Sequence, residues 1–192
     1  MTPRLLETER AGGFFTWFAL KPNGAPEPAE AGHVWQEFRP SSPNYSRLVA
    51  LAVLTDETGR IIDARLGVDR GFLEHQQESA SARDIAKSFL YWALPEQDHA
   101  DVATLLANIA DLTAGGAAVI MRGSRTPPPP DTRGGYAVFL GQDAKITLRA
   151  GTLRLVLTNF AGALPAGGIH RDGAVTSQSS PRWLRLDVRA LG

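Results

Sequence analysis

Two neighbouring stretches of the sequence, residues 47–55 and 60–68, constrain the fold more than any other feature. The first is apolar on both alternating faces, whereas the second carries apolar side chains at every other residue from Ile62 to Val68. A strand that is covered on both faces has a continuous run of apolar residues, whereas a strand covered on one face has alternating apolar and polar residues. The residues between them, Asp56 to Gly59, suit a tight turn. We therefore predict an antiparallel hairpin whose first strand lies inside a larger sheet.

A helical pattern occupies the middle of the chain. Ala82, Ile85, Ala86 and Phe89 fall on one stripe at helical spacing, which ends at Pro95. A second stripe follows Asp98, so the pattern predicts an αα-hairpin of about residues 81–94 and 98–113 between an N-terminal and a C-terminal group of strands. Further strands are predicted over 12–20, 33–38, 117–121, 136–140, 145–149, 152–158 and 183–189.

This order of elements predicts an α+β fold with one or more mostly antiparallel sheets, because the strands outnumber the helices that could cross between them. The length of 192 residues suits a single domain over 1–192. Within it, we expect a Pro-rich loop at 126–131 and a Gly/Ser-rich loop at 161–181.

The sequence lacks cysteine and the sequence motifs that mark several large enzyme classes. It has no cysteine, which excludes disulfide scaffolds, thiolate nucleophiles and cysteine-rich zinc sites. It has no nucleophile elbow, no phosphate-binding loop and no dinucleotide fingerprint. Four histidines are present, but no three are spaced as metal ligands. We expect no metal and no cofactor. Whether the protein is an enzyme stays open, and the sequence favours the answer that it is not.

The charges are unevenly distributed, although the net charge is +0. Residues 1–121 hold ten basic and sixteen acidic side chains, a net charge of −6, whereas residues 122–192 hold ten and four, a net charge of +6. Such asymmetry can mark a site for an anionic partner. The alternation of the last strands puts one set of side chains on the face opposite the leucines. This predicted basic face consists of Lys145, Arg149, Arg154, Trp183, Arg185 and Arg189.

Aromatic side chains are concentrated near the N-terminus and allow a second hypothesis. If the two N-terminal strands enclosed an apolar pocket, its ligand-binding residues would be Trp17, His33, Trp35 and Arg39. The same aromatic residues could equally fill the core.

Three functions therefore remain open. The first is a non-catalytic binding or assembly domain that associates with a protein partner or with itself. The second is a small-molecule-binding protein or enzyme that uses the aromatic N-terminal region. The third is binding of nucleic acid or another anion on the basic face, against which the zero net charge argues. The longest apolar run is far shorter than the roughly 18 residues of a membrane span, and the first residues lack the order of a secretory signal. We expect a cytoplasmic protein that makes no contact with a membrane.

Overall fold

The computed structural model of this chain describes residues 4–69, 79–94, 96, 99–100, 145–150, 153–161, 168–171 and 181–190. These residues form one antiparallel sheet and a small number of helices, which confirms the predicted α+β class. The strands are β1 (Leu20–Pro22), β2 (Glu27–Pro28), β3 (Val34–Pro40), β4 (Val49–Thr55), β5 (Ile61–Asp69), β6 (Lys145–Ala150), β7 (Leu153–Ala161) and β8 (Pro181–Ala190).

The sheet has eight strands in the order β1-β3-β4-β5-β8-β7-β6, and β2 pairs with β3 outside this path. Every pairing in the described part of the chain is antiparallel. The C-terminal strand β8 lies between β5 and β7, so it joins the two groups of strands into one sheet. β4 is an inner strand, as its apolar run predicts.

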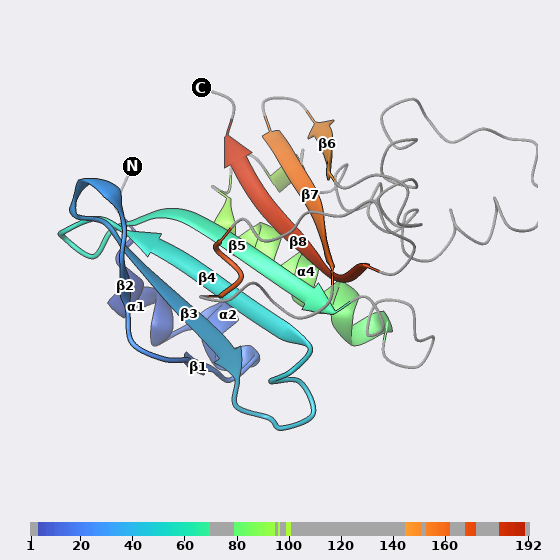
Figure 1. The fold of residues 1–192 in the computed structure, drawn as a ribbon, viewed down its shortest axis with the longest axis horizontal. Coiled ribbons are helices and arrows are strands. Elements are labelled where there is room, and N and C mark those ends of the chain that lie inside the picture. Colours follow the sequence, from blue (N-terminus) through green and yellow to red (C-terminus); the bar gives the residue numbers. More distant parts are fainter. Residues whose placement is uncertain are drawn as a thin grey trace, which may run out of the picture.

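The helices lie together on one face of the sheet, which we call the helix face (Figure 1). The helices on this face are α1 (Leu6–Arg10), α2 (Gly13–Trp17) and α4 (Ser79–Ala93), and a short 3-10 turn, η1 (Glu30–Gly32), precedes β3. α4 confirms the first helix of the predicted αα-hairpin. The second helix lies almost entirely outside the described residues, as do the predicted strands at 117–121 and 136–140 and the Pro-rich loop at 126–131.

The predicted hairpin is formed by β4 and β5, and its turn is closed by one side chain. Asp56 Oδ1 accepts hydrogen bonds from the Thr58 backbone N–H at 2.9 Å, from Thr58 Oγ1 at 2.7 Å and from the Arg60 backbone N–H at 3.0 Å. Gly59 has φ +79°, a backbone angle that residues other than glycine rarely adopt. These bonds hold the pKa of Asp56 below its usual value, although desolvation opposes them.

The main core fills the space between the helix face and the helices. It is built from large side chains of α2, the inner strands and α4 that are almost completely shielded from solvent. Their burial is the main driving force for folding of this part of the chain. The largest fully buried apolar members are Phe15, Phe38, Leu51, Leu66, Phe89 and Leu90.

The prediction of a strand over residues 12–20 is wrong. The chain there forms α2 and then turns, through Ala19 at φ +47°, into β1. Phe14 and Phe15 are buried at 3% and 1% exposure, whereas Trp17 is 77% exposed. Aromatic residues on both alternating faces also fit a short helix that buries two adjacent positions, and packing against α4 decides between the two forms.

Candidate functional site

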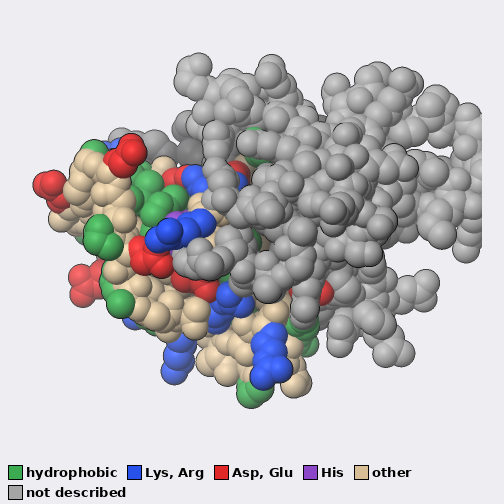
Figure 2. Space-filling view, viewed as in Figure 1, with side chains coloured by type: hydrophobic (Ala, Val, Ile, Leu, Met, Phe, Trp, Pro, Cys, Tyr) green, Lys and Arg blue, Asp and Glu red, His purple; other side chains and the backbone are tan. Residues whose placement is uncertain are grey.

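The face of the sheet opposite the helices carries charged side chains, and we call it the second face. Strand register places Glu37 beside Ala52, Ala52 beside Arg65, and Arg65 beside Asp187. One row across β3, β4, β5 and β8 therefore holds two acidic residues and one basic residue. Figure 2 shows acidic and basic side chains gathered on this side of the molecule.

Residues 168–171, which we call the strap, lie on the second face without joining the sheet. Arg65 Nη1 donates to the His170 carbonyl at 2.6 Å, and Arg185 Nη1 donates to the carbonyls of Ile169 and Arg171, both at 3.2 Å. Glu37 Oε2 accepts the Ile169 backbone N–H at 3.0 Å. Buried backbone groups need partners, and here the sheet's side chains supply them. The strap is thus held through its backbone.

The apolar part of the strap contact forms a second, small core. Ile169 is completely buried and packs with Ala50 and Ala52 of β4, and Trp35 packs against the same group. The two alanines leave room for Ile169. Close approach is also required at Gly168, which has φ +102° and where a Cβ atom would come within 2.4 Å of Glu37 Oε2.

An ion pair formed by Arg185 and Asp187 is buried beneath the strap. Arg185 Nε lies 2.8 Å from Asp187 Oδ1, Arg185 Nη2 donates to Asp187 Oδ2 at 3.0 Å, and the two side chains are 2% and 1% exposed. Desolvation raises the pKa of Asp187, and the charges of Arg185 and Arg65 only partly oppose it. The pair fixes the guanidinium that binds two strap carbonyls.

Glu37 connects the strap to the N-terminal part of the chain. Its carboxylate accepts hydrogen bonds from Asn23 Nδ2 at 2.9 Å and Arg39 Nε at 2.8 Å, in addition to the Ile169 N–H. Arg39 also donates to the Ser46 carbonyl at 3.1 Å. Three donors hold this carboxylate in one position.

A cleft of about 530 Å³ opens beside the strap. Two of the predicted ligand-binding residues, Trp35 and Arg39, line it. His33 lies half-buried just before β3, and Trp17 belongs to the helix side of the molecule. The N-terminal aromatic residues are therefore divided between the two faces and do not enclose one pocket. The cleft is lined by Asn23, Gly24, Ala25, Pro26, Glu27, Trp35, Glu37, Arg39, Gly168 and His170.

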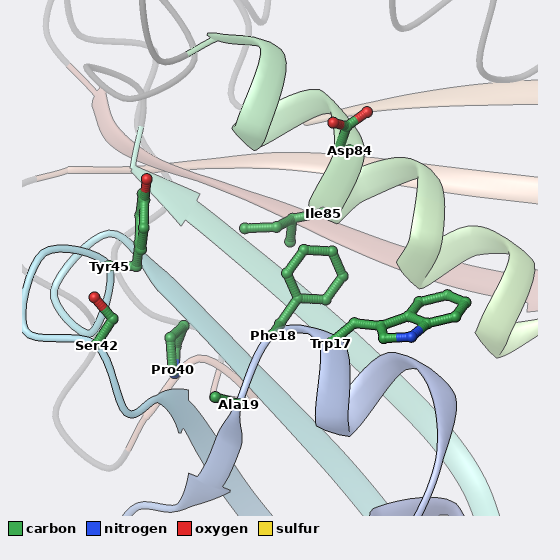
Figure 3. A pocket seen from close by; sticks show the side chains of 8 residues that line it. All are labelled: Trp17, Phe18, Ala19, Pro40, Ser42, Tyr45, Asp84 and Ile85. Atoms are coloured by element: carbon green, nitrogen blue, oxygen red, sulfur yellow. The ribbon is translucent and has the colours of Figure 1, made fainter.

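A second hollow, which we call the Trp17 pocket, lies on the helix side and is mostly apolar. Its volume is about 340 Å³. Figure 3 shows Phe18 and Ile85 pointing toward each other in its middle, with Tyr45 and the Trp17 indole at opposite ends. Asp84 and Ser42 add polar groups. The pocket is lined by Trp17, Phe18, Ala19, Pro40, Ser42, Tyr45, Asp84 and Ile85.

The residues of the predicted basic face lie on neighbouring strands. Register aligns Lys145 with Thr158 and Thr158 with Arg185, and it aligns Arg149 with Arg154 and Arg154 with Arg189. Trp183 pairs with Phe160. Among these six residues, the described side chain is that of Arg185, which is buried beneath the strap. Binding of an anion by this set, or of a small molecule by Trp35 and Arg39, stays a prediction.

Sequence reasoning missed the acidic half of this site and the strap, although a signal was present. Three strands each carry opposite charges two residues apart, and each pair is an ion pair in the structure. The distances are 2.8 Å for Arg39–Glu37, 3.1 Å for Arg65–Asp63 and 2.8 Å for Arg185–Asp187. Residues two apart share a face of a strand, so charges of opposite sign at this spacing indicate a paired polar surface.

Other kinds of site find little support in the described residues. No group of three or more His, Asp or Glu side chains there could hold a metal ion. None of the helices in that part of the chain is both long enough and apolar enough to cross a membrane. Comparison of the sequence and structure with protein-family models, curated proteins and solved structures finds no match.

Proposed function

We propose that this chain is an assembly domain that associates with a second copy of itself through the Trp17 pocket. The observation that carries the proposal is the exposure of Trp17, which is 77% accessible at the edge of an apolar hollow. An indole in water forgoes the favourable free energy of burying a large apolar surface. Tryptophan is also among the residues that contribute most at protein interfaces.

The surroundings of Trp17 argue against a purely structural role. Two other aromatic residues of the same helix, Phe14 and Phe15, are buried in the core, and the Phe14 ring stacks on that of Trp92 at 5.3 Å. The residues beside Trp17 thus fill the core, while Trp17 itself stays at the surface. An exposed apolar side chain beside an apolar hollow is typical of an interaction site.

A second copy is the partner that this surface fits best. The protruding indole and the hollow belong to one patch, so a two-fold axis beside it would place each Trp17 in the other copy's pocket. The net charge of +0 means that two copies carry no overall repulsion. Asp84 and Ser42 would form the polar rim around an apolar centre, as in other interfaces.

Replacing Trp17 with alanine should strongly weaken self-association. We expect the wild-type chain to sediment as a dimer at micromolar concentration and the Trp17→Ala variant to sediment as a monomer. Truncating a central tryptophan typically costs at least about 2 kcal/mol, roughly 30-fold in Kd. Analytical ultracentrifugation over a concentration series measures this difference.

The matched control is Ile62→Ala, which truncates another exposed apolar residue, 44% accessible, that does not line the pocket. This variant should dimerise like the wild type. A wild-type chain that is monomeric throughout the series would overturn the proposal, as would a Trp17→Ala variant with unchanged Kd.

A further inference from the structure

His170 is the one titratable side chain of the strap that is enclosed. Its side chain is 8% exposed, and its ring stacks on that of Trp35 with centroids 5.1 Å apart and an angle of 20°. Nε2 lies 3.4 Å from Glu27 Oε2, whereas Nδ1 is buried and has no hydrogen-bond partner among the residues that the structure describes. A proton added at Nδ1 would therefore be a buried donor without an acceptor, which is costly.

The charges around His170 are already paired with one another. Glu27 of β2 accepts from Arg171 of the strap at 2.7 Å. On the sheet, Glu37 pairs with Arg39 on β3, Asp63 with Arg65 on β5, and Asp187 with Arg185 on β8. Each of these four carboxylates thus has a guanidinium beside it. An imidazolium would add a positive charge to a set that is already balanced.

Burial lowers the pKa of His170 below its usual value of about 6.5, and the charge of Arg171 adds to this effect. Glu27 and Glu37 oppose it without reversing it. When the strap has left the sheet, its histidine takes up a proton near pH 6.5. When the strap is bound to the second face, which we call seated, the histidine takes up the proton at lower pH. Seating is therefore fully favourable above about pH 6.5 and becomes weaker as the pH falls below that value.

We propose that the strap is a proton-released cover of the second face. When His170 becomes protonated, residues 168–171 leave the sheet and uncover Trp35, Ala50 and Ala52. Releasing Ile169 would expose an apolar patch surrounded by the charged groups that had bound the strap backbone. The proposal concerns the face opposite the Trp17 pocket, so it does not depend on self-association.

The Ile169 backbone N–H reports on this release, because it is bonded to Glu37 only while the strap is seated. We would measure its hydrogen-exchange protection by NMR at about pH 7.5 and about pH 5.5, corrected for the intrinsic exchange rate. In the wild type, protection should fall severalfold at the lower pH. In a His170→Gln variant, which cannot take up the proton, protection should be the same at both values.

A His33→Gln variant is the control, since His33 lies outside the strap, and it should behave like the wild type. The ring carbon shifts of His170 in the wild type supply a second measurement if His170→Gln fails to seat the strap. They should titrate below pH 6.5, within the pH range over which the Ile169 protection falls. Equal wild-type protection at both pH values, or a His170 midpoint at or above 6.5, would overturn the proposal.

Discussion

Replacing Asp187 with alanine should lower the free energy of unfolding by about 3–5 kcal/mol, measured by urea denaturation. The substitution leaves the Arg185 guanidinium 2% exposed and without the carboxylate that accepts from Nη2 at 3.0 Å. Removing one partner of a buried ion pair costs far more than the pair contributes, because the remaining charge keeps its desolvation penalty. Asp187→Asn should cost less, since its amide oxygen still accepts a hydrogen bond.

A double variant separates the charge penalty from the role of Arg185 in the strap. Replacing both residues with apolar ones, Arg185→Met with Asp187→Leu, should recover most of the lost stability. It should still lower the protection of the Ile169 amide, because Arg185 no longer binds the Ile169 and Arg171 carbonyls. A loss of less than about 1 kcal/mol in the Asp187→Ala variant would contradict the buried pair.

Replacing Phe38 with alanine should also lower the free energy of unfolding by about 3–5 kcal/mol. Phe38 is completely buried, and its ring meets that of Phe15 edge to face, with centroids 5.0 Å apart. Its loss would open a cavity where β3 packs on α2. Trp17→Ala removes an even larger ring but should change stability by no more than about 0.5 kcal/mol, because Trp17 is exposed.

This contrast distinguishes aromatic residues that build the core from one that is available to a partner. Urea denaturation at a concentration where both variants are monomeric gives the comparison without a contribution from association. A Trp17→Ala variant destabilised as strongly as Phe38→Ala would mean that Trp17 is a core residue. Any loss of self-association in this variant would then be explained by its lower folding stability, without a role for Trp17 in an interface.

The fold was predictable wherever local pattern and tertiary packing agree. The apolar run of β4, the turn that begins at Asp56 and the alternation of β5 predict their hairpin, and the stripe ending in Phe89 predicts α4. α2 was not predictable, because a five-residue helix has little stability of its own and forms only through its packing on the sheet and α4.

The candidate sites were only partly predictable for a related reason. The sequence predicts Trp17, Trp35 and Arg39 as ligand-binding residues and Arg185 as part of the basic face. The surroundings of these side chains, however, depend on contacts between residues far apart in the sequence. The hydrogen bond from Arg65 to the His170 carbonyl joins residues that are 105 positions apart, and the sequence around each residue does not predict it. The opposite charges two residues apart in β3, β5 and β8 predict ion pairs on the second face. They do not predict that the strap covers this face.

The most direct test of self-association through the Trp17 pocket is an isotope-filtered NOE experiment on a mixture of labelled and unlabelled chains. It detects only contacts between copies. We expect cross-peaks between the Ile85 methyl groups of the labelled copy and the Trp17 indole protons of the unlabelled copy, because both residues line the same pocket. A dimer that gives no such cross-peaks, or gives them from residues of another surface, would contradict the proposed interface.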